Sequence, residues 1–400
     1  MSRVVPTLLA LCTWCIWLCS TDPAVAEQTA QQRDQVERVT KHYAELVYAV
    51  YADSLAGVKR LNHAIDDFLA QPTEERLAKC REAWIAARVP YGQSEVFRFY
   101  SGPIDSATGP EARINSWPID EAWLESGQPD QPGIVEDVKG LPRIGPAELK
   151  ARNQVEGEKN ISCGWHAIEF MLWGQDLSPT GPGNRPVTDY TKGPFAKRRA
   201  AVLRAAGVLL EQDLESVARE WKAGEKNYRE GFTDPNSART SLAHILTGMF
   251  YLPSHEMAGE RMGVALETKD QENEQSCFSD TTHLDFLNNL AGIRAVWTGK
   301  YEARFVPGGS VEGAGVRELA AALAPEFAKD IDTAFVQTER KLQLIPVPFD
   351  QAIRGADDDA PGRRAVFESL RQIEGLAARF KQLAKQLSVE LERQDASPAG

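Results

Sequence analysis

Apolar residues recur at the spacing of an α-helix over most of this 400-residue chain, and this periodicity constrains the fold more than any other feature. In the segment 31–69, for example, Val36, Val39 and Tyr43 would lie on one helix face. No stretch shows the alternation that is typical of a series of β-strands. The pattern predicts an all-α protein with helices long enough for bundles. The expected helices cover residues 31–69, 72–90, 91–100, 199–222, 237–262, 276–297, 319–342 and 363–392.

Residues 1–26 have the pattern of a secretory signal peptide. Arg3 precedes an apolar run over 8–19 that is too short to span a bilayer, and Ala24-Val25-Ala26 is a small-x-small cleavage site. We therefore expect an exported protein whose mature chain begins at Glu27. The alternative is a lipoprotein acylated at Cys19. No later apolar run is long enough to cross a membrane.

Charge and cysteine content narrow the class of partner. The formal net charge is −12 and no dense basic stripe is present, which argues against nucleic acid as a partner and is compatible with cations. Three cysteines remain after the expected cleavage, Cys80, Cys163 and Cys277. An odd, small number is not a disulfide framework, so a single Cys163–Cys277 bridge and three free thiols are equal alternatives.

Two loop-rich stretches organise the chain. Residues 101–157 contain seven prolines and many glycines, which predicts long loops with short helices. A second loop, 178–194, is the expected domain boundary. The expected organisation is a signal peptide at 1–26, a first helical bundle at 27–194, a second at 195–394 and a disordered tail at 395–400.

A weak internal repeat fits two related bundles. Ile168-x5-Gly174 recurs as Ile293-x5-Gly299, with a Trp inside each copy. A duplication would produce this pattern, and chance matching would produce it nearly as well. If the repeat is real, Arg294 stands where the first copy has Glu169, and the chemistry belongs to the first copy alone.

The segment 160–174 is apolar on nearly every side if it is helical, yet it contains His166 and Glu169 three residues apart, on one helix face. A carboxylate in such surroundings is costly unless it is paired, hydrogen-bonded or bound to a metal. The pair therefore presents an imidazole and a carboxylate to one cation, or it forms a buried hydrogen bond that only stabilises a core. Neither familiar helix-borne zinc-peptidase pattern is complete, because the positions that would need a second histidine hold Gly259 and Phe170.

Further acidic, basic and imidazole side chains are candidates for the same site. Glu95 is the leading extra carboxylate, since its aromatic neighbours predict partial burial, although a surface ion pair with Arg98 is an equal alternative. For most of the others a solvated helix face or a helix N-cap is the alternative role. The residues that we expect to line the site are Arg98, Asp105, Asp120, Asp189, Glu256, Glu260, Asp280 and His283.

Several motifs together resemble the imelysin-like family, in its iron-regulated protein A branch. They are GWHAIEFMLWGQD (164–176), GPGNRP (181–186), TDY (188–190), FRFYSGPID (97–105), ERM (260–262) and SCFSD (276–280). The resemblance covers most of the mature chain. It implies two related four-helix bundles, export to the periplasm or outer cell envelope, and a role in iron acquisition. The family's G-x-H-x-x-E motif falls on Gly164, His166 and Glu169.

The sequence therefore supports one main hypothesis and two alternatives. The main hypothesis is an envelope protein that binds iron, or an iron chelate or haem, through His166, Glu169 and Glu95, and hands it to an envelope transport partner. Zinc and copper suit the same donor types. The alternatives are a metallopeptidase that uses the same pair, as the family name implies, and a structural envelope scaffold.

Overall fold

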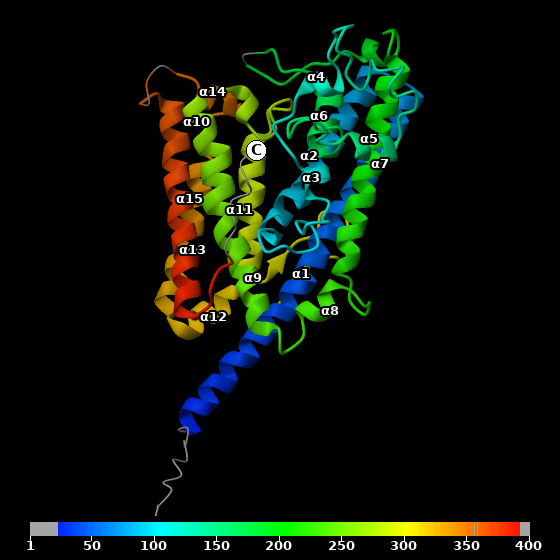
Figure 1. The fold of residues 1–400 in the computed structure, drawn as a ribbon. Coiled ribbons are helices and arrows are strands. Elements are labelled where there is room, and N and C mark those ends of the chain that lie inside the picture. Colours follow the sequence, from blue (N-terminus) through cyan, green and yellow to red (C-terminus); the bar gives the residue numbers. More distant parts are fainter. Residues whose placement is uncertain (1–22, 179, 356, 358, 393–400) are drawn as a thin grey trace, which may run out of the picture.

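The computed structural model describes residues 23–178, 180–355, 357 and 359–392. Most of the expected signal peptide, with Cys19, and the whole expected tail at 395–400 lie outside these residues. The fold is all-α, as the periodicity predicted. Among the described residues, no helix is long and apolar enough to cross a membrane. Figure 1 shows two groups of long helices side by side.

The first helix group contains α1 (Pro23–Ala70), α2 (Glu74–Ser94), α6 (Gly164–Trp173) and α7 (Ala196–Glu220). α1 packs along α2 and α7, and α6 fills the space between α2 and α7. The expected division into bundles at 27–194 and 195–394 remains a prediction. α7 begins directly after that boundary and packs against α1, α5 and α6.

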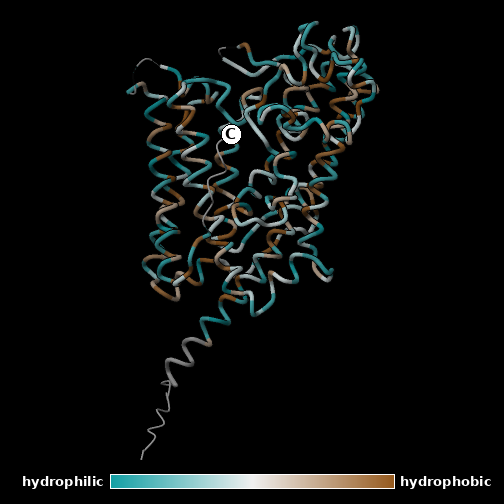
Figure 2. Tube along the Cα trace, viewed as in Figure 1, coloured by the Kyte–Doolittle hydropathy of each residue, from teal (hydrophilic) through white to brown (hydrophobic). Residues whose placement is uncertain are grey.

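The second helix group contains α9 (Ala238–Tyr251), η3 (Leu252–Gly263), α11 (Thr282–Thr298), α13 (Pro325–Leu342) and α15 (Pro361–Gln386). α15 packs against α9, η3 and α13, and α11 packs against α13 and across to α2. In Figure 2, hydrophobic and hydrophilic residues alternate along these helices, as expected of helices that bury one side. α2 contacts α6 of the first group and α11 of the second, so the region where the two groups meet, called the junction below, lies along α2.

Short elements connect the long helices. The long loops predicted for 101–157 are present and contain only α3, α4 and α5. A two-stranded antiparallel sheet pairs Lys300 with Glu312. The short elements are η1 (Glu95–Phe97), α3 (Glu111–Ile114), α4 (Glu121–Leu124), α5 (Pro146–Arg152), η2 (Val187–Tyr190), α8 (Tyr228–Phe232), α10 (Val264–Thr268), η4 (Gln271–Asn273), β1 (Lys300–Tyr301), β2 (Val311–Glu312), α12 (Val316–Leu323) and α14 (Phe349–Ile353).

Several predicted helix boundaries were wrong. The helix expected over 319–342 is divided into α12 and α13 before Pro325, and α15 ends at Gln386 rather than at 392. Two further differences lie beside the site. α2 does not end at Pro90 but continues to Ser94, because Ala87 and Tyr91 on either side of the proline are completely buried and keep this turn packed. α11 begins at Thr282 rather than at 276. The preceding residues form a loop in which the Ser276 amide donates to the Thr282 hydroxyl at 2.9 Å, and such side-chain bonds compete with helix formation.

The helix expected over 237–262 changes its hydrogen-bond register partway. α9 is a regular α-helix, and η3 continues it as a π-helix that begins at Leu252. Pro253 has no N–H to donate to the carbonyl four residues earlier, so the α-helical ladder is interrupted here. The wider turn of η3 carries Glu256, which contacts Arg98, and Arg261, which donates to Glu95.

The three described cysteines are free thiols and are all buried. Of the two alternatives from the sequence, the structure therefore has the one with three free thiols. Burial raises the pKa of the Cys80 and Cys163 thiols to about 12. These thiols are protonated near neutral pH and are poor metal ligands in this form.

Candidate functional site

α6 holds His166 and Glu169 against each other in the interior. His166 Nδ1 lies 2.8 Å from Glu169 Oε2, and the two side chains are 2% and 0% exposed. The helix can start where it does because Gly164 has a φ of +86°, and a Cβ there would lie 2.5 Å from the Arg113 carbonyl oxygen. The predicted contact along one helix face is therefore present.

Glu169 also joins α6 to the loop that precedes α11. Its Oε1 accepts hydrogen bonds from the Ser279 amide at 2.9 Å and from the Ser279 hydroxyl at 2.6 Å. Burial raises the pKa of Glu169 to about 7, against the opposing effect of Ser279 and Arg88. Both carboxylate oxygens of Glu169 thus have partners: Oε2 contacts His166 in the first helix group, and Oε1 contacts Ser279 before α11 of the second.

The second ring nitrogen of His166 faces a cation. Its Nε2 lies 3.4 Å from Nη2 of Arg88 on α2. Burial and Arg88 lower the pKa of His166 well below its usual value, so the imidazole is neutral. A guanidinium N–H can only donate, which assigns the lone pair to Nε2 and the ring proton to Nδ1. The imidazole therefore donates to Glu169 through Nδ1 and accepts from Arg88 through Nε2.

Arg88 connects this pair to the second helix group and to Glu95. Its Nε donates to Asp285 of α11 at 2.9 Å and its Nη1 donates to Asn115 at 2.9 Å. Asn115 in turn donates to Glu95 Oε1 at 2.6 Å. The three residues expected as metal ligands are therefore linked through Arg88 and Asn115.

Glu95 is fully buried and is held by two arginines. Its Oε2 accepts a hydrogen bond from Arg261, and Arg98 lies 3.9 Å from its Oε1. Burial raises the pKa of Glu95, but Arg261 and Arg98 lower it by more, so the net pKa lies below the usual value. Glu95 is therefore ionised near neutral pH.

Arg98 and Glu256, both expected to line the site, lie beside Glu95. Arg98 Nη2 is 3.2 Å from Glu111 and 3.5 Å from Glu256, and Glu256 is 3.4 Å from Arg261 Nη2. The network, which is buried except for Arg98, Glu111 and Glu256, thus contains two more carboxyl groups than guanidinium groups. Its ionisable members are Glu95, Glu111, Glu169, Glu256, Asp285, Arg88, Arg98 and Arg261.

Four of the residues expected to line the site have other local contacts. Asp105 accepts from the Gly102 amide at 2.8 Å and closes its own loop. Asp120 is exposed and caps α4 by accepting from the Ala122 amide at 3.0 Å. Asp189 pairs with Arg185 at 3.1 Å, and Glu260 is half-exposed beside His255. These four side chains close a loop, cap a helix or form ion pairs away from His166.

Asp280 and His283 lie next to the network, on the loop that carries Ser279 and on the first turn of α11. Asp280 is 6% exposed and has a left-handed φ of +56°. His283 is half-buried, and burial lowers its pKa. Neither carboxylate oxygen of Asp280 has a hydrogen-bond partner among the described residues, and Thr281, at the N-cap position of α11, makes no side-chain capping bond, so neither residue caps this helix.

Sequence reasoning missed the residues that connect the network. Arg88 had a usable pattern, since a basic residue between Ala87 and Val89 in an apolar helix turn is the same conflict that singled out His166. No sequence pattern points to Asn115 or Asp285, because their partners lie far away in the sequence. Ser279 belongs to the SCFSD motif, but nothing in that motif predicts its contact with Glu169.

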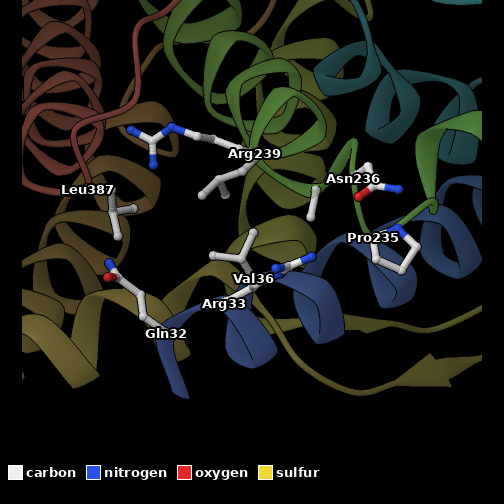
Figure 3. A pocket seen from close by; sticks show the side chains of 9 residues that line it. Gln32, Arg33, Val36, Pro235, Asn236, Arg239 and Leu387 are labelled. Carbon is white, nitrogen blue, oxygen red and sulfur yellow. The ribbon is translucent and has the colours of Figure 1, made fainter. Parts of the chain in front are cut away.

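Two of the cavities in the described part of the chain lie outside the network. The pocket in Figure 3, about 350 Å³, is lined by Arg33 and Val36 of α1, by Asn236 and Arg239 beside α9, and by Leu387. A second cavity of about 540 Å³ lies at the C-terminal end of α6. It is lined by residues that include Glu125, Phe170, Trp173, Arg185 and Asp189. This second cavity reaches the same helix as His166 and Glu169, although neither residue lines it.

The fold and the site together define an all-α protein in which two helix groups meet over a buried H-x-x-E pair. The sequence model of the Imelysin family, peptidase M75, matches residues 47–380, and the chain belongs to this family. The predicted resemblance is thereby confirmed.

Individual relatives agree with this assignment. The chain is 25% identical over 318 residues to iron-regulated protein A of Synechococcus elongatus, covering 76% of this chain and 74% of that protein. The crystal structure of an iron-regulated protein A precursor from Parabacteroides distasonis has a TM-score of 0.67 at 20% identity and covers 88% of this chain and 95% of that one. An imelysin-like protein from Psychrobacter arcticum has a TM-score of 0.65 at 13% identity, with 90% and 98% covered. These structures share the fold.

Proposed function

We propose that this protein binds iron in the cell envelope, as the ion, a chelate or haem, and passes it to an envelope transport partner. The observation that carries the proposal is the neutral, buried imidazole of His166, whose Nδ1 is held by Glu169 and whose Nε2 lone pair is contacted only by Arg88 among the described residues. A carboxylate that holds the second ring nitrogen is the usual arrangement around a metal-binding histidine. Two of the similar proteins carry the name iron-regulated protein A.

The contacts suggest a distinct role for each proposed ligand. His166 binds the metal through Nε2 once Arg88 moves aside, and Glu169 orients the ring through Nδ1. Glu169 becomes a direct ligand only if it releases Ser279. Glu95 becomes available when Arg261 transfers to Glu256, which already lies 3.4 Å away.

The charge of the network favours a cation. Its carboxyl groups outnumber its guanidinium groups, and Asp285 and Glu95 are almost completely buried, at 3% and 1% exposure. Buried carboxylates in excess are costly, and a bound cation offsets that cost. One imidazole with carboxylates suits iron, and it also suits zinc and copper, so the metals must be compared directly.

Metal binding to the purified protein tests this proposal. Metal-free protein is dialysed against Fe²⁺ without oxygen, and separately against ferric citrate, haem, Zn²⁺ and Cu²⁺, and bound metal is measured by elemental analysis. His166→Ala is expected to abolish tight binding, and Glu169→Gln to weaken it by roughly 10- to 100-fold. The matched control is His63→Ala on the exposed side of α1, which should bind as the wild type does. Equal binding by wild type and His166→Ala would refute the proposal.

The same protein samples distinguish the two alternatives. The pair is buried, so a peptide bond reaches it only if the junction opens. The metallopeptidase would replace the transport proposal if the wild type cleaves a peptide, and if this cleavage is lost both with a chelator and in His166→Ala. If the protein neither binds a metal nor cleaves a peptide, the structural scaffold is the remaining alternative.

The proposed location has its own test. N-terminal sequencing of the protein from a fractionated cell envelope should give a mature chain that begins at Glu27. An acylated N-terminal Cys19 would support the lipoprotein alternative. A chain that stays in the cytosol and retains residues 1–26 would refute export.

A further inference from the structure

Three acidic side chains from separate segments converge near the junction. Glu274 follows η4, Asp280 precedes α11, and Asp350 lies in the first turn of α14. One carboxylate oxygen from each lies within 4.8 Å of the others. The three residues are only 1%, 6% and 1% exposed. Such proximity of buried carboxylates is costly without a counter-charge.

The decisive observation is that these buried carboxylates lack hydrogen-bond donors. Among the described residues, neither oxygen of Asp280 accepts a hydrogen bond. The same holds for the two oxygens of Glu274, although the Thr282 hydroxyl lies close enough to lower the pKa of this carboxyl. Buried polar groups normally have partners. Two unpaired carboxylates that face a third point to a ligand that supplies positive charge.

One arginine reaches the cluster and does not neutralise it. Arg354 Nη2 lies 2.8 Å from Asp350 Oδ2, and the Arg354 side chain is 42% exposed. It contacts Asp350 from the solvent side and leaves the other two carboxyl groups without an ion pair among the described residues. One guanidinium against three carboxyl groups leaves the cluster with an excess of acidic groups.

The titration behaviour agrees with this geometry. Burial, Asp280 and Asp350 raise the pKa of Glu274 well above its usual value. Burial, Asp176 and Asp350 raise the pKa of Asp280 to about 7. Metal-free protein therefore holds protons here that a cation would displace.

The loop keeps Asp280 in place without a metal. Asp280 has a left-handed φ of +56°, which is costly for a residue other than glycine. Contacts on both sides of it maintain this conformation: Ser279 and Thr281 share a hydroxyl hydrogen bond of 2.7 Å, and the Ser276 hydroxyl donates to Asp285 at 2.6 Å. The carboxylate is thus presented by a loop that is already ordered.

We propose that Glu274, Asp280 and Asp350 form a second metal site, for a hard divalent cation of the Ca²⁺ or Mn²⁺ class. Carboxylate oxygens alone, completed by water, are the ligands that these ions prefer. The site shares no residue with the His166 site. It lies beside it, because Ser279, the residue before Asp280, holds Glu169. A cation here adds to the contacts that hold the loop between the two helix groups.

Binding of Mn²⁺ to the full mature chain tests the site. Free Mn²⁺ is followed by electron paramagnetic resonance while metal-free protein is titrated, and Ca²⁺ is then added as a competitor. Wild type should bind one Mn²⁺ that Ca²⁺ displaces. Asp280→Asn should weaken binding by at least the roughly 10- to 100-fold that loss of a supporting residue costs at metal sites. Glu215→Gln, an exposed acid on α7, is the control and should bind as wild type does.

His166→Ala separates this site from the proposed iron site. If this variant binds Mn²⁺ as wild type does, the two sites are independent, as proposed. If His166→Ala loses Mn²⁺ and Asp280→Asn retains it, the cation occupies the junction site and the acidic site is refuted. Unchanged affinity in both Asp280→Asn and Glu274→Gln also refutes it. Circular dichroism of each variant confirms that the fold is intact.

Discussion

The guanidinium of Arg88 lies 3.4 Å from Nε2 of His166, the one ring nitrogen that Glu169 does not hold. Burial and this contact keep the imidazole neutral, and Arg88 covers the nitrogen that we propose as the metal ligand. Because Arg88 also donates to Asp285, the same side chain joins the first helix group to α11. Arg88 therefore both covers Nε2 of His166 and links the two helix groups.

Arg88→Ala tests the structural link. The substitution leaves Asp285 buried without its ion-pair partner, since the pair is only about 4% exposed on each side. Loss of one partner of a buried pair should lower the free energy of unfolding by about 3–5 kcal/mol. Urea unfolding measures it. Arg143→Ala, on a side chain that is 88% exposed, should change stability by less than about 0.5 kcal/mol. Equal effects of the two variants would contradict this assignment.

Ser279→Ala tests the contact between Glu169 and the second helix group. The variant loses the hydroxyl donor to Glu169 and keeps the amide donor. One missing hydrogen bond to a buried carboxylate should cost about 1–3 kcal/mol of stability. Iron affinity should also fall, because Glu169 loses part of its support. Ser279→Thr, which keeps the hydroxyl, should recover most of both losses. A Ser279→Ala protein with wild-type stability would exclude a significant role for this hydroxyl.

Part of this site was predictable and part was not, for a physical reason. His166 and Glu169 meet because they lie one turn apart on a single helix, and helical spacing is visible in the sequence. Their partners Arg88, Asp285 and Ser279 belong to other segments, and only packing brings them together. The all-α fold was likewise visible in the periodicity. The extension of α2 past Pro90 depends on tertiary burial, which overrides local preference.

Gly164→Ala tests the start of α6. The residue has a φ of +86°, and the new Cβ would lie 2.5 Å from the Arg113 carbonyl oxygen. Backbone strain of about 1–3 kcal/mol is expected, with a displaced His166 and weaker metal binding. Gly231→Ala is the matched control, because its Cβ would meet no atom within 4 Å and its φ is not positive. Thermal unfolding of both variants decides, and a neutral Gly164→Ala would contradict the strain argument.

Glu125 should contribute stability that depends on pH. Burial opposes ionisation, but Arg199 and Arg185 outweigh it, so the folded-state pKa lies below the usual 4.5. A lowered carboxyl pKa stabilises the fold above pH 4.5, and that contribution is lost as the pH falls through the folded-state pKa. Glu125→Gln should therefore be less stable than wild type by about 1–3 kcal/mol at pH 7. The difference should shrink towards pH 3. An equal difference at both pH values would contradict it.

Asp280→Asn should stabilise the metal-free protein and remove its response to metal. At neutral pH, the substitution removes one of three neighbouring buried carboxyl groups and keeps the side-chain volume, so repulsion with Glu274 and Asp350 decreases. In the presence of EDTA the variant should unfold at a higher urea concentration than wild type. With Ca²⁺ at 100 times its dissociation constant, wild type should gain about 2.7 kcal/mol and the variant almost nothing. Glu215→Gln should follow wild type in both conditions. If Asp280→Asn is instead less stable in EDTA, the Asp280 carboxylate makes a necessary contact and is not an unpaired charge that awaits a cation.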